Sequence, residues 1–296
     1  MMKKKRSVRK VVIPAAGFGT RFLPMTKAQP KEMLPVVDKP VIQYVVEEAI
    51  VSGISDILII TGRNKRAIED HFDRSFELES KFVVDRTNPF FRSLRSLSDM
   101  PDLHYIRQKE QKGLGDAVLL AERHCDDEPF ALLLGDTICI SPPGVTTCTR
   151  QMMDAYDRYK KSIIAVEPVP RNKIQDYGII NGNEISKDVF SIKDIIEKPV
   201  PDQAPSNLGA IGRYILTPEI FPLLRTIPPG HHGEIQLTDA LRQLDEPLGL
   251  ITDCRRYDIG DKLGWMKSSI ELTLEREEFA DEMRAFISGI LRGDHP

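Results

Sequence analysis

The sequence predicts an α/β fold in which a mainly parallel β-sheet is covered by helices on both faces. Three observations predict this fold. Apolar runs without polar alternation recur through the first half of the chain, and helix-like segments separate them. Residues typical of helix ends mark the boundaries, as Pro40 does before one helical segment and Gly53 does after it. Buried strands that alternate with helices are typical of parallel sheets.

The first half of the chain alternates strands with helices. Strands are expected at 10–15, 56–61, 103–108 and 130–136, and helices at 40–53, 64–72 and 115–125. Ligands of such sheets bind where the carboxyl ends of the strands open into loops. The loop after residues 10–15 and Asp136, which ends another apolar run, are therefore expected at the same rim of the sheet.

The second half mixes strands with short amphipathic helices. Strands are expected at 160–170, 177–185, 192–199, 209–217 and 248–260, and helices at 218–227 and 234–244. The dipeptide Asn181-Gly182 predicts a hairpin turn. The polar and irregular residues 80–102 predict a loop or a helical excursion.

The C-terminal segment predicts one long helix over residues 265–291. Its apolar residues recur at the spacing of a single helix face, at Phe279, Met283, Phe286, Ile287 and Ile290. Such a face either packs on its own domain or contacts a second subunit, and the sequence leaves both interpretations open.

The composition argues against several classes of protein. The chain has 296 residues, of which 41% are hydrophobic and 29% charged, as is typical of a globular protein. Its formal net charge of -3 argues against a dedicated nucleic-acid binder, so no nucleic-acid partner is expected. The apolar run behind the basic residues 1–9 is too short for a signal-peptide core or a membrane span. We therefore expect a solvated basic tail, no membrane partner and a cytoplasmic location.

The cysteines and histidines do not follow the spacing of a metal or disulfide motif. The four cysteines form no C-x-x-C pair, so reduced thiols are expected rather than disulfides or zinc ligands, at Cys125, Cys139, Cys148 and Cys254. The adjacent histidines at 231–232 lie in a Pro/Gly loop and lack the spacing of a zinc motif.

A glycine-rich loop follows the first strand and reads AAGFGTRFLPMTKAQPK over residues 15–31. Glycines after a strand expose backbone N–H groups that can bind phosphate. Two familiar nucleotide motifs are nevertheless missing from the sequence. Phe22 stands where G-x-G-x-x-G requires a glycine, and no G-x-x-x-x-G-K-[ST] run occurs. On the glycines alone, a plain tight turn is an equally good interpretation.

Two cations favour the phosphate-binding interpretation. Arg21 follows the glycines directly, and Lys31 stands behind Pro24 and Pro30, which restrict the freedom of the loop. Arginine offers a planar fork and lysine a point charge, so the two together suit a polyphosphate. A solvated basic loop is the alternative.

The same loop resembles the signature of the sugar-1-phosphate nucleotidylyltransferases, G-x-G-T-R-x-x-P followed by P-K. The resemblance covers roughly residues 10–278, and further matching stretches read IRQKEQKGLGDAV, VEPV, DYGII, IIEKP, APSNLGAIGRYIL, EIQLTDAL and YDIGDKLGWMKSSIE. Within the family, the stretch PKEMLPVVDKPVIQYVVEE is most similar to the bacterial members that transfer a uridylyl group from UTP to glucose-1-phosphate.

The resemblance implies a Rossmann-like mixed, mainly parallel sheet, with smaller β excursions and a C-terminal helix. It implies a single nucleotidyltransferase domain at 10–264, divided into a nucleotide-binding half at 10–140 and a sugar-binding half at 141–264. Residues 265–296 are then a C-terminal helical segment and a candidate oligomer contact. The family is typically dimeric or tetrameric, which implies a homodimer or a homotetramer.

The resemblance also implies a role for each matching residue. The implied catalytic residues are Arg21, Lys31 and Lys198. The implied nucleotide-binding residues are Ala15, Ala16, Gly17, Gly19, Thr20, Gln108, Gly113 and Asp136. The implied sugar-binding residues are Gly178, Glu197 and Lys198, and the implied ligands of Mg²⁺ are Asp136 and Asp258. Without the resemblance, an aspartate after a strand is more often a turn former, and an adjacent Glu-Lys pair is usually solvated.

The implied reaction brings two anions together. An oxygen of glucose-1-phosphate attacks the α-phosphorus of UTP, which gives UDP-glucose and pyrophosphate. A phosphate monoester is largely dianionic at pH 7, so the nucleophile needs no activating base. This fits a sequence without a visible Ser/His/Asp or Cys/His arrangement. Catalysis is expected to rest on cations and alignment, with Mg²⁺ held by one or two carboxylates.

Three residues depart from the family pattern. Asp116 stands where the family usually has histidine, Thr137 where relatives have Asp or Val, and Gly209 where alanine is common. Asp116 and Gly209 leave open a related enzyme that uses dTTP or another sugar-1-phosphate. A catalytically silent regulatory paralogue is a third interpretation. It is disfavoured because Arg21, Lys31, Asp136, Lys198 and Asp258 are all present.

Overall fold

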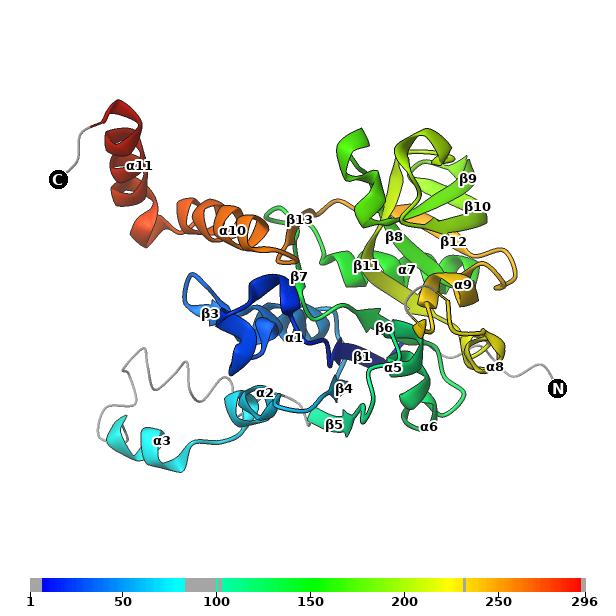
Figure 1. The fold of residues 1–296 in the computed structure, drawn as a ribbon, viewed down its shortest axis with the longest axis horizontal. Coiled ribbons are helices and arrows are strands. Elements are labelled where there is room, and N and C mark those ends of the chain that lie inside the picture. Colours follow the sequence, from blue (N-terminus) through cyan, green and yellow to red (C-terminus); the bar gives the residue numbers. More distant parts are fainter. Residues whose placement is uncertain (1–6, 83–99, 101–102, 231–232, 294–296) are drawn as a thin grey trace.

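The computed structural model describes residues 7–82, 100, 103–230 and 233–293 (Figure 1). The histidines at 231–232, residues 1–6 of the basic tail and most of the polar stretch 80–102 lie outside the described residues. Within the described ranges, no helix combines the length and the apolarity that crossing a bilayer requires.

A nine-stranded sheet forms the centre of the fold, with the strand order β5-β4-β1-β6-β11-β8-β12-β10-β9. Its strands are β1 (Lys10–Ala15), β4 (Asp56–Thr61), β5 (Leu103–Arg107), β6 (Phe130–Leu133), β8 (Ile163–Pro168), β9 (Gly178–Ser186), β10 (Val189–Glu197), β11 (Leu208–Leu216) and β12 (Leu248–Ile251). The first four in spatial order are parallel, whereas β11 runs antiparallel to both of its neighbours β6 and β8. The predicted mixed α/β sheet is confirmed, with parallel pairing concentrated among β5, β4, β1 and β6 and mostly antiparallel pairing among the remaining strands.

Helices cover both faces of this sheet. Side chains of alternate residues on β1 explain why: Val11 and Ile13 belong to one hydrophobic cluster, and Val12 belongs to the other. The first cluster is completed by α1 (Val41–Val51), α2 (Arg66–Phe72) and α7 (Cys148–Tyr159). The second is completed by α5 (Leu114–Leu120), α6 (Glu122–Cys125), α8 (Ile220–Thr226) and α9 (Leu237–Leu241). Each strand in the centre is therefore apolar on both sides, which produces continuous apolar runs in the sequence.

The hairpin predicted at Asn181-Gly182 is wrong. Both residues lie inside β9, and the chain reverses between Ser186 and Val189, where Asp188 takes the left-handed conformation with φ 62°. A Cβ on Gly182 would lie 2.5 Å from the carbonyl oxygen of Ser191. The register between β9 and β10 also shifts just beyond this point. The glycine therefore serves a close approach of two backbones rather than a turn.

Two C-terminal elements are each divided where the sequence predicts one. The strand expected at 248–260 is β12 in the main sheet and β13 (Arg255–Asp258), which pairs with β7 (Thr137–Ile140) in a separate ribbon. The helix expected at 265–291 is α10 (Lys262–Leu274) followed by α11 (Glu277–Arg292). Arg276 between them is extended, and its guanidinium lies 2.7 Å from the Asp38 carboxylate, so a tertiary ion pair accompanies the break. The helix expected at 115–125 likewise divides into α5 and α6.

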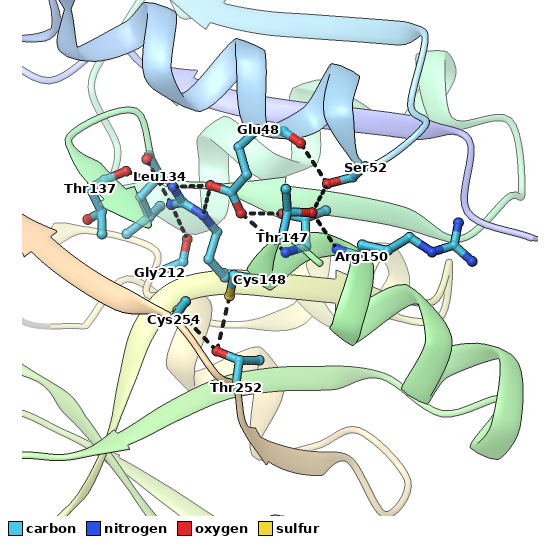
Figure 2. Close-up of polar contacts among 12 residues, drawn as sticks. Glu48, Ser52, Leu134, Thr137, Thr147, Cys148, Arg150, Gly212, Thr252 and Cys254 are labelled. Atoms are coloured by element: carbon cyan, nitrogen blue, oxygen red, sulfur yellow. Dashed lines mark hydrogen bonds and ion pairs between the residues drawn. The ribbon is translucent and has the colours of Figure 1, made fainter. Parts of the chain in front are cut away.

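The four cysteines are free thiols. Three of them converge although the spacing in the sequence gives no sign of it: the sulfur atoms of Cys139, Cys148 and Cys254 lie within 4.8 Å of one another. Thr252 lies beside them, with its hydroxyl 3.3 Å from the sulfur of Cys148 (Figure 2). The remaining described elements are α3 (Phe76–Phe82) and the short pair β2 (Pro35–Val36) and β3 (Lys39–Pro40).

Candidate functional site

The glycine loop follows β1 and folds back on itself through three short 3-10 helices, at Thr20–Phe22, Met25–Lys27 and Lys31–Met33. Gly19 takes φ 65°, and its carbonyl oxygen accepts a 2.7 Å hydrogen bond from the hydroxyl of Thr26. A Cβ on Gly19 would lie 3.2 Å from the Cβ of Lys31, and one on Gly17 would lie 4.0 Å from its ammonium nitrogen. The glycines therefore allow Lys31 to lie directly against the loop that precedes it.

Lys31 forms an ion pair with Asp136 that joins this loop to the end of β6. The Lys31 Nζ lies 2.5 Å from the Asp136 Oδ2, and both side chains are half-buried. Burial alone would lower the pKa of Lys31, but the Asp136 carboxylate raises it above its usual value. Burial alone would raise the pKa of Asp136, but the charges of Lys31 and Arg21 hold it below its usual value. Both groups are therefore charged at neutral pH.

Asp258 is brought next to Asp136 by the ribbon of β7 and β13. In this antiparallel pair Asp258 lies opposite Thr137, and the N–H of Ile259 donates a 3.1 Å hydrogen bond to the carbonyl oxygen of Asp136. The two predicted metal ligands thus lie at one place in the fold, although the ribbon itself was not expected. The expectation that Asp136 and Asp258 lie at the same rim of the fold therefore agrees with the structure.

Arg21 lies beside the segment that follows Asp258. A Cβ on Gly260 would lie 3.4 Å from the Arg21 Nη1 and 2.7 Å from the Asp258 Oδ1. Gly260 donates its N–H to that same carboxylate oxygen at 2.8 Å. Arg21 thus lies beside Asp258, and its charge helps to lower the pKa of Asp136. The Arg21 side chain is solvent-exposed, as is Thr20 beside it.

A cavity of about 270 Å³ opens next to these charges. Its lining joins the glycine loop and the ion pair to the residues predicted to contact the base: Pro14, Ala16, Gly17, Lys31, Glu32, Gln108, Gln111, Gly113, Leu114, Ala117, Leu134, Asp136 and Glu234. Gln111 was not predicted; its side-chain amide donates to the carbonyl oxygen of Ala16. Ala15 does not line the cavity, since it is a buried residue of β1.

Gln108 and Asp116 form a hydrogen-bonded pair at the wall of this cavity. The Gln108 Nε2 donates to the Asp116 Oδ2 at 2.6 Å and to the Gly113 carbonyl oxygen at 3.3 Å. Only 5% of Gln108 is exposed. The aspartate that departs from the family pattern is therefore in contact with the residue predicted to read the base.

Gly113 is held by the segment before α9. It takes φ 101°, and a Cβ would lie 2.6 Å from the carbonyl oxygen of Ile235. That oxygen accepts a 2.9 Å hydrogen bond from the N–H of Gly115, and Ile235 in turn donates to the carbonyl of Lys112. No side chain fits at position 113 without moving this backbone.

The predicted sugar residues form a second group, on the β9–β10 pair. Gly178 lies opposite Glu197, whose Oε2 accepts a 2.6 Å hydrogen bond from the hydroxyl of Thr238. Lys198 follows with φ 47° and an exposed side chain, and its Nζ lies 3.6 Å from the Glu197 Oε1. Gly209 lies close by: a Cβ there would approach the Tyr177 Cβ to 3.2 Å.

Tyr177 and Arg256 connect this group to Asp258, and neither was predicted. The backbone carbonyl of Tyr177 accepts from the N–H of Lys198, and its hydroxyl donates to the Asp258 Oδ2 at 3.1 Å. The Arg256 guanidinium stacks on the Tyr177 ring, donates to the same Asp258 oxygen at 3.0 Å and also binds Glu167. The sequence does contain a signal for Arg256. It precedes Asp258 by two positions, and residues two apart on a strand project from the same face.

Arg213 fixes the turn that carries Asp136, and it was also missed. It is fully buried in β11 and forms an ion pair with Glu48 of α1 at 2.8 Å. Its guanidinium donates to the carbonyl oxygens of Leu134 at 3.3 Å and Thr137 at 2.7 Å, which flank Gly135 and Asp136 (Figure 2). A cation inside the apolar run GAIGRYIL requires a buried partner, and that was the available signal.

A second buried ion pair lies beneath the glycine loop. Lys65, just before α2, lies 2.7 Å from the Glu32 Oε2, and both side chains are almost fully buried. Burial raises the pKa of Glu32 and lowers that of Lys65 against their mutual attraction. Glu32 is next to Lys31 in the chain, so this pair fixes the backbone from which Lys31 projects.

Comparison with known proteins gives consistent matches over nearly the whole chain. The model of the nucleotidyl transferase family matches residues 10–264. A UTP–glucose-1-phosphate uridylyltransferase of Bacillus subtilis (strain 168) is 52% identical over 291 residues, which are 97% of each chain. A UDP-glucose pyrophosphorylase solved in complex with UDP-glucose is 43% identical, with a TM-score of 0.83, and the match covers 91% of this chain and all of that one. The UTP-bound enzyme of Acinetobacter baumannii is 35% identical, with a TM-score of 0.87 over 95% of this chain and 98% of that one.

Proposed function

This chain belongs to the nucleotidyl transferase family, and we propose that it transfers the uridylyl group of UTP to glucose-1-phosphate, forming UDP-glucose and pyrophosphate. The observation that carries the proposal is the convergence of Arg21, Lys31, Asp136 and Asp258 at one place in the fold, where Lys31 and Asp136 line a cavity. These four charged groups come from segments far apart in the sequence. Relatives with 45–52% identity over nearly their full length are named UTP–glucose-1-phosphate uridylyltransferase.

The reaction is a direct displacement at phosphorus. A non-bridging oxygen of the sugar phosphate forms a bond to the α-phosphorus, and the bond from that phosphorus to the oxygen bridging to the β-phosphate breaks. Pyrophosphate carries away the electron pair. Because the attacking monoester has its second pKa near 6, it is mostly dianionic at pH 7 and no protein base has to remove a proton. The protein has to overcome the repulsion between two anions and align them in line.

The glycine loop and its two cations supply the positive charge on the nucleotide side. Lys31 is placed against Gly17, so its ammonium group can bind a phosphate oxygen that the loop backbone also contacts. Arg21 is exposed and beside Gly260, so its guanidinium is free to bind a phosphate bidentately. Ala16, Gly17, Gly19 and Thr20 would then contribute backbone contacts to the triphosphate.

Asp136 and Asp258 fit a magnesium site by their chemistry and their placement. Magnesium prefers oxygen ligands and is usually held by one or two carboxylates together with substrate phosphates and water. Asp258 ends β13 and Asp136 directly precedes β7, the strand paired with β13. Asp258 stays in place through Tyr177, Arg256 and Gly260. When bound, Mg²⁺ would offset the charge that develops on the phosphates.

The β9–β10 group would hold the sugar phosphate. Glu197 is oriented by Thr238, so its carboxylate can accept hydrogen bonds from glucose hydroxyls. The exposed Lys198 can turn from Glu197 to the phosphate of the incoming sugar. Gly178 leaves the space beside Glu197 open, because a Cβ there would lie 3.3 Å from its Oε2.

The test is a substrate panel. Purified protein with Mg²⁺, UTP and glucose-1-phosphate should release pyrophosphate, and four nucleoside triphosphates crossed with several sugar phosphates should show the highest kcat/KM for this pair. A higher kcat/KM with dTTP would assign the chain to a related specificity. No turnover with any pair would favour a catalytically silent paralogue.

We also propose that the protein forms a homodimer or a homotetramer through α11. One face of this helix exposes apolar side chains, at Phe279, Phe286 and Ile290. A cavity of about 890 Å³ lies between α11 and the ends of β7 and β13. The double substitution Phe286→Glu with Ile290→Glu should lower the mass measured by light scattering to that of a monomer, whereas Val51→Glu, at an exposed apolar site on α1, should not. A monomeric wild-type protein would refute the proposal.

A cytoplasmic location is proposed as well. The free thiols fit a reducing compartment, and both proposed substrates are intracellular metabolites. Recovery of the protein in the soluble fraction of the cell interior would support this location, and recovery from the exterior would contradict it.

A further inference from the structure

We propose that Asp116 is a positioning residue that makes the base pocket select uracil-type bases over cytosine, by fixing the orientation of the Gln108 amide. The inference rests on the proposed function, because it assumes that the nucleotide base lies against Gln108. It deepens that function by naming how the pocket distinguishes one pyrimidine from another. Asp116, the residue that carries the inference, is one of the three that depart from the family pattern.

The orientation of the Gln108 amide follows from chemistry. A glutamine amide has a donor end and an acceptor end of nearly the same shape. An ionised carboxylate can only accept hydrogen bonds, so the end that faces the Asp116 Oδ2 at 2.6 Å must be the NH₂ group. The carbonyl oxygen of Gly113, at 3.3 Å from the same nitrogen, is also an acceptor and favours the same orientation.

Both N–H bonds of this amide are therefore directed into the protein. One points to Asp116 and the other to Gly113, which leaves the Oε1 as the polar atom that Gln108 can offer to the cavity that it lines. Among the described residues, none donates a hydrogen bond to this Oε1. The wall of the cavity at Gln108 is thus a hydrogen-bond acceptor.

The acceptor is held in place by rigid surroundings. Gln108 is 5% exposed, and its backbone N–H donates to the carbonyl oxygen of Thr61 at 2.8 Å. Gly113 is fixed by its contact with Ile235. Asp116 lies in the first turn of α5, where the helix dipole favours a negative charge. A flipped amide would place oxygen against oxygen at both internal contacts.

An acceptor at this position distinguishes the pyrimidines at N3. Uracil and thymine carry a hydrogen on N3 and can donate it to the Gln108 Oε1. Cytosine has a lone pair on N3, so it would face that oxygen with two acceptors and no hydrogen between them. A site that leaves a buried polar pair unmatched in this way discriminates strongly between substrates. A histidine at position 116 could donate a hydrogen bond to the Gln108 amide or accept one from it, whereas an aspartate allows only one orientation of that amide.

The test is Asp116→Asn, which keeps the size of the side chain. An asparagine can turn either its oxygen or its nitrogen toward Gln108, so the flipped glutamine amide is no longer opposed at position 116 and is opposed only by the longer, 3.3 Å contact with the Gly113 carbonyl oxygen. The ratio of kcat/KM for UTP to that for CTP should fall at least tenfold, mainly through a lower KM for CTP. Glu122→Gln removes a nearby carboxylate that pairs with Arg225 instead, and it should leave the ratio unchanged.

A double-mutant cycle separates positioning from a merely structural effect. In a Gln108→Ala background, Asp116→Asn should change the UTP-to-CTP ratio less than twofold, because the amide that Asp116 orients is gone. An equal change in both backgrounds would overturn the proposal, as would a ratio within threefold of wild type in the single variant. If the wild type turns over no nucleotide, the proposed function has failed. The same ratios can then be measured as dissociation constants of UTP and CTP by equilibrium dialysis, which tests the pocket alone.

Discussion

The ammonium group of Lys31 lies 2.5 Å from the carboxylate of Asp136, although 105 positions separate the two residues in the chain. This ion pair closes the glycine loop against the end of β6. It also holds a cation and a metal-ligand candidate next to each other before any substrate is present. Asp136 raises the pKa of Lys31, and Lys31 lowers the pKa of Asp136, so both groups stay charged. The pair is therefore a stable arrangement of opposite charges and not a proton donor.

The pair predicts how stability depends on pH. The pKa of Asp136 is lowered on folding, so its contribution is present above about pH 4 and is lost as the pH falls through the folded-state value. The pKa of Lys31 is raised, so its contribution is present below about pH 10 and is lost as the pH rises through the folded-state value. Wild-type stability should therefore not change between pH 5 and 9 on account of this pair.

Lys31→Met should reverse the direction in which folding shifts the pKa of Asp136. Without the Lys31 charge, the effect of burial prevails and raises the pKa of Asp136 above its unfolded value, so the ionised carboxylate destabilises the fold. Relative to wild type, the free energy of unfolding of the Lys31→Met variant, measured in urea, should increase when the pH is lowered from 8 to 5. Lys27→Met, in the same loop but exposed, provides the control and should follow wild type. If the free energy of unfolding depended on pH in the same way in all three proteins, the Lys31 charge would not be what lowers the pKa of Asp136.

Arg21→Ala should lower kcat without lowering stability. The side chain is exposed, so its loss should change the free energy of unfolding by no more than about 0.5 kcal/mol. If its charge acts mainly on the transition state, kcat for pyrophosphate release should fall on the order of a hundredfold or more. Lys27→Ala removes an exposed cation from the same loop and should keep near-normal rates. A near-normal rate for Arg21→Ala would make it a structural arginine.

Arg213→Met should destabilise the protein and also inactivate it. Removing one partner of a buried ion pair typically costs about 3–5 kcal/mol, and here Glu48 would keep its charge at a fully buried site. Combining it with Glu48→Gln should recover part of the free energy of unfolding, because the unpaired charge is removed. Activity should not recover, since the carbonyls that flank Asp136 have still lost their donors. Full recovery of kcat in the double variant would show that the contact with this turn has no positioning role.

The sequence predicts well those parts of the fold that depend on local pattern. Strands such as 10–15 and 56–61 are continuous apolar runs because both of their faces are buried, and their bounds agree with β1 and β4. The helix α7 was missed although Thr147 caps it and Met152 and Tyr156 share its buried face. Both the capping threonine and the apolar spacing of this helix are present in the sequence.

Other features depend on tertiary contacts that no local pattern contains. Asn181-Gly182 is a strong turn signal, yet the same glycine also suits a strand that passes close to Ser191. The contact between Gln108 and Asp116 joins a strand end to a helix, and the family pattern showed only that Asp116 was unusual. Resemblance identified the candidate residues, whereas the ribbon of β7 and β13 that brings Asp258 to Asp136 became visible only in the structure.

Lys198→Ala should raise the KM for glucose-1-phosphate more than the KM for UTP. A charged hydrogen bond to a phosphate is worth about 1.5–3 kcal/mol, so the KM for the sugar phosphate should rise about tenfold or more. Thr238→Val removes the hydroxyl that orients Glu197 and should give a smaller increase of the same kind. Lys193→Ala removes an exposed lysine of β10, the strand that precedes Lys198, and should leave both KM values unchanged. Equal increases in both KM values would contradict the assignment of Lys198 to the sugar phosphate.

Gly113→Ala should impair nucleotide binding as well as stability, and Gly53→Ala is its matched control. Both glycines have positive φ, at 101° and 89°, so each alanine introduces backbone strain of about 1–3 kcal/mol. At Gly53 nothing lies within 4 Å of the added Cβ, so strain is the whole effect and the KM for UTP should not change. At Gly113 the Cβ would meet the Ile235 carbonyl oxygen at 2.6 Å, and the backbone that accepts from Gln108 must move. The KM for UTP should therefore rise in this variant alone, and equal UTP kinetics in the two variants would show that the shape of this turn does not matter to the base pocket.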